Sequence, residues 1–293
     1  MYNLIAFFAE ICYNTCMDQL KYHFSLMNYD YLLDNDPTSQ ERKNEYYLHM
    51  HNDYEILFFF GGNADYVIEN KLYHLKKNTL MFIKPMVYHG LNVLSNAPYE
   101  RAVFNFSQLA VPYFLQSHIS GLKSQYTIKE NSPIYSLFAA LREYKHIFEP
   151  KEFEQLKKSS LLNLLSMLHY ASAADIEQPE PVNNGVLDRI IEYINANPDQ
   201  NLNTQVLSDL FFVSKSWIDH AFKKQLKTSP KNYINHKKVL YAQSLILDGK
   251  SIAEIVETCN YENYSTFYRQ YKFFLKHEPA YDKLLYNETH KKK

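Results

Sequence analysis

Over the first half of the chain, apolar and polar residues alternate in short runs, a period of two that is typical of β-strands. Turn residues separate these runs, most clearly at positions 61–62 and 70–71. The runs predicted as strands are residues 54–60, 66–69, 72–75, 79–84 and 101–106. Several short strands at this spacing predict a β-barrel or a β-sandwich.

Beyond residue 107 the apolar positions recur at helical spacing instead. Pro133 and Pro150 are each placed to begin a helix, because the amide hydrogen that proline lacks would be unpaired in a first turn. The second helix is rich in leucine over residues 153–168, and such a stripe usually packs against the helix's own domain. Residues 175–185 then combine prolines, acids and asparagines without apolar periodicity, so we interpret them as a linker.

The last third of the chain contains an internal sequence repeat of two copies. Residues 214–223 fall on residues 263–272 when shifted by 49 positions, with polar, apolar and aromatic residues in register. Such self-similarity indicates a supersecondary unit that is used twice. Each copy is predicted to be a helix, a tight turn and a second helix. The predicted N-caps are Asn203 or Thr204, Ser214, Ser251 in a capping box with Glu254, and Asn263.

A longer helix is predicted between the two copies. Ser229 is placed to cap it, Pro230 fits its first turn, and Asp248 and Gly249 end it. A rigid helix of this kind would hold two outward-facing helices at a fixed spacing, and successive major grooves on one side of DNA lie about 34 Å apart. The duplication therefore favours a DNA-binding domain over an ordinary helical bundle with solvated lysines.

A set of residues between 187 and 283 carries a family resemblance. Its members are Ile194, Ser214, Phe222-Lys223-Lys224, Ser229-Pro230, Tyr233, Ala242, Leu245-Ile246-Leu247, Ser251-Ile252-Ala253-Glu254-Ile255, Asn260-Tyr261, Tyr264-Ser265, Phe267, Arg269, Tyr271-Lys272 and Pro279. This region resembles the AraC/XylS transcriptional regulators, whose DNA-binding domain joins two helix-turn-helix motifs by a long helix. The resemblance implies base contacts by Ser216, Asp219 and His220 in the first motif and by Tyr264, Ser265, Tyr268 and Arg269 in the second. Phosphate contacts are expected from Lys215, Lys223 and Lys272.

The chain departs from the family pattern at several positions. Lys227, Lys276 and Asn260 stand where the family usually has glycine, so these residues are expected to adopt the left-handed conformation at a modest cost. Lys238 stands where arginine is usual. His220 also replaces a common arginine, which weakens base contact by the first motif, whereas Arg269 keeps the side chain that most often reads guanine.

Chemistry-bearing residues gather in the strand-rich half. His49, His51 and Glu55 have odd numbers, so they share one face if the strand is regular, and a second strand can bring His89 to the same place. Residues 45–107 resemble the cupin barrel that forms the sensor half of many AraC-type regulators.

Three interpretations of these four residues remain open. Three histidines and a glutamate can hold a divalent transition metal, as metal-binding cupins do. In regulatory cupins the same positions commonly line a pocket for a small polar effector, often a sugar, without a metal. The imidazoles can also simply satisfy one another and the nearby backbone. The aromatic residues Tyr54, Tyr66 and Tyr73 fit sugar stacking and a barrel core equally well.

Composition adds a charge asymmetry to this picture. The 293-residue chain has a net charge of −1, but residues 183–293 carry 16 Lys+Arg against 12 Asp+Glu, whereas residues 1–182 carry 15 against 20. Three cysteines without zinc spacing favour reduced thiols. The apolar run 4–12 contains Glu10 and is interpreted as neither signal peptide nor membrane span. Met17 is an alternative start.

Together these observations predict an α+β protein with an N-terminal cupin-like β-barrel, a helical dimerisation region and a C-terminal all-α domain with two helix-turn-helix motifs. The predicted segments are an N-terminal extension at 1–44, the barrel at 45–107, the helical region at 108–174, the linker at 175–185 and the DNA-binding domain at 186–286. In the family such helices also supply a dimer interface, and the candidate here is the stretch 153–168.

The function implied is that of a cytoplasmic bacterial regulator of AraC type and not of an enzyme. Its expected partners are double-stranded DNA, a small-molecule effector such as a sugar, a second copy of the chain and RNA polymerase, with no membrane. No cofactor is expected, and His49, His51, Glu55 and His89 are the candidates should a metal bind. The alternatives are a metal-dependent cupin enzyme with a helical tail and a regulator whose barrel only dimerises.

Overall fold

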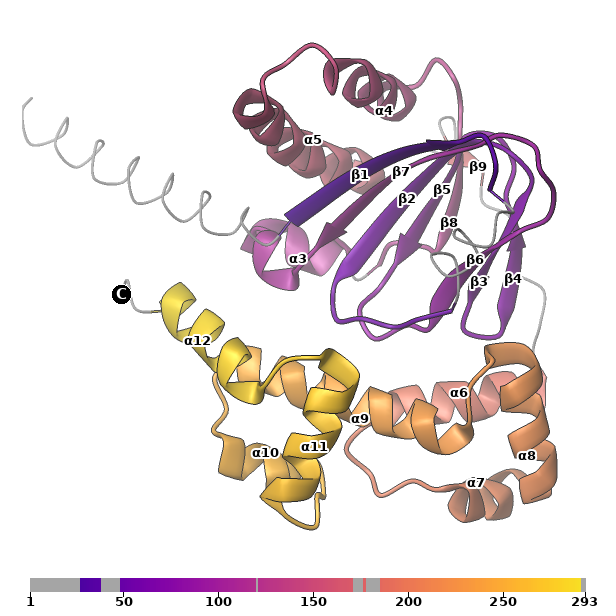
Figure 1. The fold of residues 1–293 in the computed structure, drawn as a ribbon, viewed down its shortest axis with the longest axis vertical. Helices are drawn as coiled ribbons and strands as arrows, with labels where there is room; N and C mark the ends of the chain where they lie inside the picture. The colour runs from indigo at the N-terminus through magenta and orange to yellow at the C-terminus, as the bar shows by residue number, and fades with distance from the viewer. Residues whose placement is uncertain (1–26, 38–47, 120, 171–175, 178–184, 291–293) are drawn as a thin grey trace, which may run out of the picture.

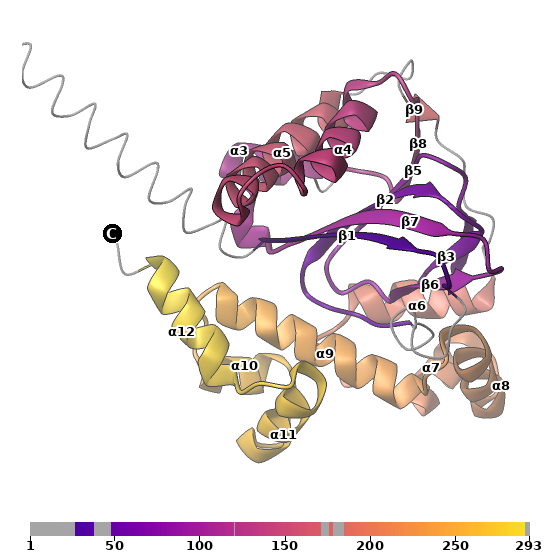
Figure 2. The same cartoon turned by 45° about the horizontal axis from the view of Figure 1, so that its top comes forward.

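A computed structural model describes residues 27–37, 48–119, 121–170, 176–177 and 185–290. The apolar run 4–12, Cys12, Cys16 and Met17 lie outside these ranges. The described chain has a sheet-containing N-terminal half, with helices on one side, and a wholly helical C-terminal half (Figures 1 and 2). This mixed arrangement agrees with the α+β prediction. None of the described helices combines the length and apolar composition that a membrane span requires.

The N-terminal half contains two antiparallel sheets. The six-stranded sheet has the order β1-β7-β2-β5-β8-β9, and the three-stranded sheet has the order β4-β3-β6. The strands are β1 (Met27–Asp34), β2 (Tyr54–Gly61), β3 (Ala64–Ile68), β4 (Lys71–His74), β5 (Thr79–Ile83), β6 (His89–Val93), β7 (Tyr99–Phe106), β8 (Gln125–Ile128) and β9 (Ile176–Glu177). Strand β1 pairs with β7 along its whole length, so part of the predicted N-terminal extension belongs to the sheet.

The expectation of a closed barrel is wrong. After the turn that follows β2, the chain leaves the large sheet, and β3 pairs with β4 and β6 instead of with β5. Each sheet therefore keeps its own edges, and the two face each other as an open sandwich. The isolated bridge between His49 and His89 adds backbone pairing at the rim.

Strand β2 is apolar on both faces because each face covers a different core. Ile56, Phe58 and Phe60 point into the cluster shared with the helices, whereas Leu57 and Phe59 point into the cluster between the two sheets. This alternation follows from the two-residue period of a strand. It also explains why a run without polar interruptions forms a strand here.

Three helices cover the outer face of the large sheet (Figure 2). They are α3 (Tyr113–Ile119), α4 (Pro133–Tyr144) and α5 (Pro150–Tyr170), and a short 3-10 turn, η2 (Gln108–Ala110), precedes them. Leu161, Leu164, Leu165 and Leu168 are buried in the same core as β2. The leucine stripe is thus accounted for by packing within its own domain.

The C-terminal half consists of helices around a central α9. The elements are α6 (Val186–Ala196), α7 (Thr204–Phe211), α8 (Lys215–Ala221), η3 (Phe222–Leu226), α9 (Pro230–Leu247), α10 (Ile252–Thr258), α11 (Tyr264–Leu275) and α12 (Pro279–His290). The caps predicted from the sequence are formed by Asn203, Ser214, Ser229, Asn263 and the box of Ser251 with Glu254. The core of the first unit includes the buried side chains of Leu207, Ile218 and Phe222. The core of the second includes those of Ile255, Phe267 and Tyr271.

The positions where glycine is usual in the family have the backbone that glycine favours. Lys227, Asn260 and Lys276 have φ values of 55°, 50° and 65°. Lys227 ends the helical run after α8 and Lys276 caps α11, so the two copies end in the same left-handed way. Asn260 tolerates this region better than lysine does, because its short polar side chain can bond locally.

Candidate functional site

Both helices expected to read DNA bases are accessible. In α8, Ser216 and His220 are exposed and Asp219 is half-buried, because Ile218 and Ala221 turn inward. In α11, the exposed side chains are those of Tyr264, Ser265 and Arg269, and Tyr268 is half-buried.

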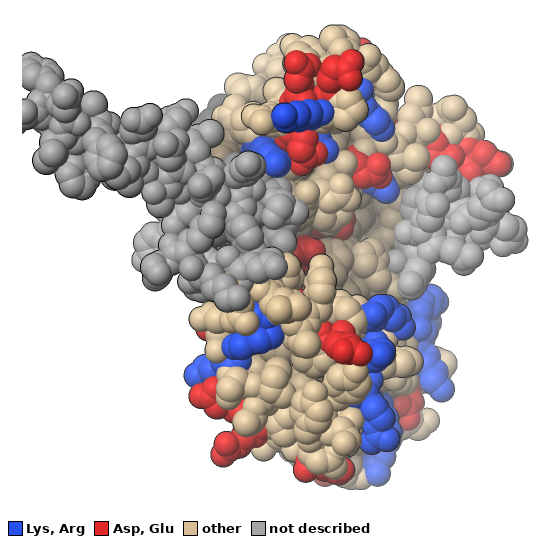
Figure 3. Space-filling view, turned by 60° about the vertical axis from the view of Figure 1, so that its left-hand side comes forward, with Lys and Arg blue, Asp and Glu red and all other residues tan. Residues whose placement is uncertain are grey.

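The three lysines expected to contact phosphates are exposed as well. Lys215 lies at the start of α8, Lys223 follows that helix, and Lys272 lies on the last turns of α11. Lys272 is 3.2 Å from Glu278, an ion pair on the surface that DNA phosphates can replace. Figure 3 shows lysine and arginine side chains gathered along one side of the C-terminal domain, which gives that domain a basic flank.

A helix of fixed length joins the two units. Helix α9 has 18 residues, which corresponds to about 27 Å at the usual rise per residue. Helix α8 lies near one end of α9, with α11 away from that end (Figures 1 and 2). The spacing is of the same order as the groove repeat of DNA, about 34 Å.

The four side chains singled out in the sensor half come together. His49, His51, Glu55 and His89 each offer a ligand atom, and these atoms all lie within 4.8 Å of one another. Glu55 is brought there by the inner face of β2, and His89 by the start of β6. Backbone hydrogen bonds of 2.8 and 2.9 Å between His49 and His89 join the two segments.

In Glu55, His51 and His89, the polar side-chain atom that points away from the cluster has a hydrogen-bond partner of its own. The hydroxyl of Tyr66 donates to Oε1 of Glu55 at 2.8 Å. Nδ1 of His89 is 2.7 Å from the carbonyl oxygen of Val87, and Nδ1 of His51 is 3.1 Å from the carbonyl oxygen of Asp53. Since a carbonyl only accepts, each Nδ1 carries the proton, and the Nε2 atoms face the cluster.

Glu55 and His51 each shift the pKa of the other. Burial by itself raises the pKa of Glu55, but His51 and His89 outweigh this effect and hold the pKa well below its ordinary value. Burial lowers the pKa of His51, and the bond and charge of Glu55 outweigh that effect and raise it. Glu55 is therefore an anion at neutral pH.

A cavity of about 330 Å³ adjoins the cluster between the sheets. Its lining includes His49, Glu55, Tyr66, Tyr99 and Arg101. Tyr54, proposed from the sequence as a possible stacking residue, instead stacks on Phe82 and Phe106 on the other side of the sheet. The cavity is large enough for a small polar molecule, and it offers an acid, a base and hydroxyl groups to bind one.

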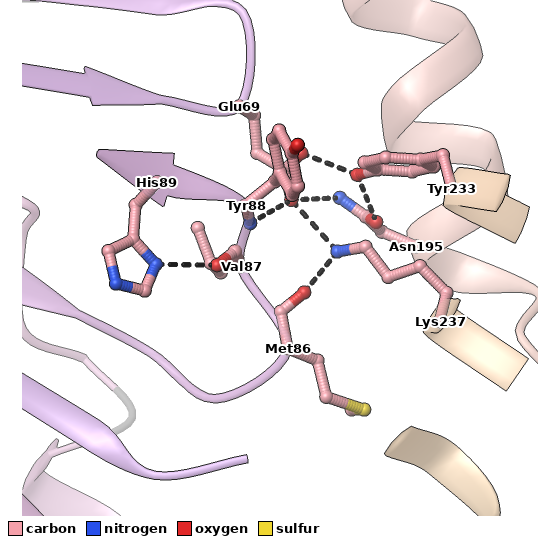
Figure 4. A network of polar contacts seen from close by, with 8 residues as sticks. All are labelled: Glu69, Met86, Val87, Tyr88, His89, Asn195, Tyr233 and Lys237. Atoms are coloured by element: carbon pink, nitrogen blue, oxygen red, sulfur yellow. Dashed lines mark hydrogen bonds and ion pairs between the residues drawn. The ribbon is translucent and has the colours of Figure 1, made fainter. Parts of the chain in front are cut away.

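The sensor half is joined to the DNA-binding half by a polar network (Figure 4). Glu69, in the turn between β3 and β4, accepts from Nζ of Lys237 at 2.8 Å, from Nδ2 of Asn195 at 3.3 Å and from the hydroxyl of Tyr233. Its carboxylate also accepts from the backbone amide of Tyr88 at 3.2 Å. Lys237 donates in addition to the carbonyl of Met86.

Apolar side chains surround this network. Met50 and Tyr88 are buried in the core of the first helix-turn-helix unit, and Leu48 and Met86 pack against that core. We call Leu48, Met50, Met86, Tyr88, Glu69, Asn195, Tyr233 and Lys237 the interdomain joint. Sequence reasoning missed its polar members, because a lysine on a helix and a glutamate in a turn look like solvated charges.

An exposed pair of helix-turn-helix units joined to a pocket-bearing sensor domain defines a ligand-responsive DNA-binding protein. The family described as AraC-like ligand binding domain matches residues 38–176, and the family described as helix-turn-helix domain matches residues 207–281. The chain belongs to the AraC-type transcriptional regulators and is not an enzyme.

Relatives agree with this assignment. The chain is 27% identical over 243 residues to the uncharacterized HTH-type transcriptional regulator YdiP of Escherichia coli, covering 78% of this chain and 77% of that protein. It is 22% identical over 226 residues to the uncharacterized HTH-type transcriptional regulator YfiF of Bacillus subtilis, covering 72% and 70%.

Solved structures of similar proteins are more distant. ToxT from Vibrio cholerae is 13% identical with a TM-score of 0.37, and the match covers 88% of this chain and 98% of that one. A transcriptional regulator with an AraC-type DNA-binding domain from Chromobacterium violaceum is 22% identical with a TM-score of 0.33, covering 34% and 91%.

Proposed function

We propose that this AraC-type regulator binds a small polar effector in the cavity beside His49, His51, Glu55 and His89 and reads DNA through α8 and α11. The observation that carries the proposal is the joint, because it connects the pocket-bearing domain directly to the helix shared by both DNA-binding units. In this proposal the protein acts in the cytoplasm as a homodimer on double-stranded DNA and recruits RNA polymerase.

The effector acts by shifting an equilibrium between two arrangements of the DNA-binding domain. It can do so only if it binds one arrangement more tightly than the other. His49 and Gly90 line the cavity, and they lie within two residues of Leu48, Met50 and Tyr88 of the joint. An effector that moves these two segments would therefore change the contacts of α9. A sugar is one effector of the right size and polarity.

Base contact is assigned to Ser216, Asp219 and His220 in α8 and to Tyr264, Ser265, Tyr268 and Arg269 in α11. Phosphate contact is assigned to Lys215, Lys223 and Lys272. The second unit is the stronger reader, because Arg269 is exposed and arginine binds guanine through two hydrogen bonds.

The DNA assignment is tested by comparing two substitutions on a site selected from random DNA by the wild-type protein. Arg269→Ala is expected to cost about 1–3 kcal/mol on that site and little on random DNA. Lys272→Ala is expected to weaken both DNAs alike, because phosphates carry no sequence information. Lys77→Ala, at an exposed lysine in the sensor domain, is the charge-matched control. Equal losses on both DNAs for Arg269→Ala would remove Arg269 from the reading surface.

The dimer remains a separate part of the proposal. The inward leucines of α5 are used within the domain, so the surface that we propose for a second copy is the groove between α4 and α5, which Leu137, Leu156 and Met167 help to line. Sedimentation of the full chain with and without Leu137→Glu tests this. A wild-type protein that sediments as a monomer would exclude it.

A further inference from the structure

We infer that a second ligand site lies between the sensor half and the second helix-turn-helix unit, and that it binds a small organic cation, an amine or an amidine with an apolar body. The cation bridges Asp53 of the sensor half and Asp282 of α12. This site goes beyond the proposed function, because its cavity and the cavity between the sheets have no lining residue in common.

The internal repeat places Asp282 at the position that Tyr233 has in the first unit. Helix α9 begins at Pro230 and α12 begins at Pro279, 49 residues later, which is the shift that relates the two copies. Tyr233 and Asp282 are therefore each the fourth residue of their helix. Where the first unit has a large aromatic ring, the second has a short carboxylate.

Within their own units, these two positions make equivalent contacts. The ring of Tyr233 meets the ring of Phe222 edge-on, with the centroids 5.4 Å apart. Tyr271 corresponds to Phe222 in the second copy, and its hydroxyl donates to the carboxylate of Asp282. Nε2 of Gln243 also lies 3.2 and 3.3 Å from the two oxygens of that carboxylate. The carboxylate of Asp282 is thus held in a fixed position.

The two positions differ in what they meet on the sensor side. The hydroxyl of Tyr233 donates to Glu69 in the interdomain joint. Asp282 instead faces Asp53 across a cavity of about 420 Å³ that both residues line. Among the residues that the structure describes, none donates a hydrogen bond to the side chain of Asp53. The first unit is therefore linked to the sensor half at this position, whereas the second unit has a cavity there.

The charges that face each other across this cavity are alike. Burial raises the pKa of Asp53, the charge of His51 lowers it, and the charge of Asp282 raises it. Burial also raises the pKa of Asp282, although its hydrogen bonds and the charge of His277 act in the opposite direction. None of the described residues that line the cavity is a lysine or an arginine. Because a carboxylate removed from water is stabilised by an opposite charge, the cavity favours a cation.

The rest of the lining indicates the body of the ligand. Leu247, Phe274, Tyr281 and Leu285 line the cavity on the side of the second unit. Apolar walls of this kind bind carbon, and the faces of aromatic rings attract cations. A cavity of about 420 Å³ also has the volume of a small-molecule site. An amine or amidine on an apolar or aromatic body matches both parts of the lining.

A bound cation gives the second unit a link that the first unit already has. Tyr233 and Lys237 hold the first half of α9 against the sensor half. Gln243, on the second half of α9, bonds to Asp282. A cation between Asp53 and Asp282 therefore fastens the second half of α9 to the sensor half as well.

Binding is measured by titration calorimetry on the full chain, with phenethylamine and benzamidine as the cationic probes. Phenethyl alcohol and phenylacetate have similar bodies but carry a neutral group and a negative group. We expect one cation per chain, bound at least about 10-fold more tightly than either control compound. Absence of saturable binding by both cationic probes refutes the site, and equal binding of phenethyl alcohol refutes the role of charge.

Two substitutions each remove one of the facing carboxylates. Asp53→Asn and Asp282→Asn are each expected to weaken binding of the cationic probes by about 10-fold or more. Asp209→Asn, which removes an exposed carboxylate bonded to Gln205 in the DNA-binding domain, is the matched control and should bind like the wild type.

Circular dichroism establishes which variants are folded. Asp53→Asn replaces a half-buried side chain to which no described residue donates a hydrogen bond, so it keeps the test valid if Asp282→Asn does not fold. Unchanged binding by folded Asp53→Asn places the cation elsewhere and refutes the inference.

The bridge has its own measurement. Exchange of backbone amide hydrogens is followed by mass spectrometry with and without phenethylamine. A bridging cation is expected to slow exchange on both sides of the cavity, in residues 50–53 and in α12, and this protection should be lost in Asp53→Asn. Protection of one side alone refutes the bridge. Sequence-specific DNA binding by the ligand-free protein is measured separately, so failure of the cation site leaves the proposed regulator standing.

Discussion

The joint predicts that removing one charge from the sensor domain destabilises the DNA-binding domain. Glu69→Gln keeps the shape of the side chain but replaces the carboxylate with an amide. The side chain of Lys237 is 4% exposed and that of Glu69 is 13% exposed, so the ion pair is almost fully shielded from solvent. After the substitution, Lys237 can still donate to the amide oxygen of residue 69 and to the carbonyl of Met86, but it becomes a buried cation without a counter-charge.

The expected cost can be estimated from this environment. Removing one partner of a buried ion pair costs about 3–5 kcal/mol, because the remaining charge stays desolvated. The carbonyl of Met86 offsets part of that cost, so we expect about 3 kcal/mol, which corresponds to about 1–3 M in the urea midpoint. The reverse change, Lys237→Met, should cost less, about 1–2 kcal/mol, because Glu69 keeps Tyr233, Asn195 and the amide of Tyr88 as donors.

The assay is urea unfolding of the full chain, followed by the fluorescence of Trp217. This residue, the single tryptophan of the chain, lies in α8, whereas Glu69 belongs to the sensor half, so a shift of its transition reports coupling between the two halves. The double variant should be less destabilised than the sum of the single variants, since the two residues interact directly. Glu130→Gln, which removes an exposed carboxylate paired with Lys77, is the control and should leave the midpoint unchanged. An unchanged Trp217 transition in Glu69→Gln would refute the joint as an energetic link.

Three further substitutions test the construction of the DNA-binding domain by the same urea assay. Lys276→Gly should raise stability by about 0.5–1 kcal/mol, because φ is 65° at this position and glycine adopts that conformation without steric cost. Gly249→Ala should lower it by about 1–3 kcal/mol, because φ is 94° and the added Cβ would lie 2.5 Å from the hydroxyl oxygen of Tyr286. Ser251→Ala should cost about 1 kcal/mol, because the amide of Glu254 would lose the side-chain oxygen that caps it.

Local patterns were sufficient to predict most of the DNA-binding half. Caps, turn residues and the repeat act within a few positions of the chain, so Ser214, Ser251 and Asn263 could be placed from the sequence alone. The left-handed residues Lys227 and Lys276 were predicted from positions where related proteins carry glycine, and the φ values confirm this expectation. Strand parity grouped His49, His51 and Glu55, and a second strand was expected to bring His89 to them. The four ligand atoms do lie together, although residues 52–53 form a bend and β2 begins only at Tyr54.

Features that depend on long-range packing were missed. Strand β1 lies in a segment with little alternation and is held by β7, more than 60 residues away. Strand β8 lies in the stretch that was predicted as helical, and it pairs with β5. The contact of Glu69 with Lys237 spans 168 residues, and neither side chain carries a local signal of burial. Such pairs become visible only when the two domains are placed together.

Helix α9 determines how a change at the joint reaches DNA. Tyr233 and Lys237 in its first half bind the sensor half, and Leu240, just past its middle, packs in the core of the first unit. Its second half carries Ala242 and Ile246, which pack in the core of the second unit. Since one helix of 18 residues contributes to all three contacts, a displacement at the joint acts on both recognition helices together. The core of the second unit contains no sensor residue among the parts of the chain described, whereas the core of the first unit includes Met50 and Tyr88. We therefore expect a change at the joint to act first on the unit that contains α8 and to reach α11 through α9.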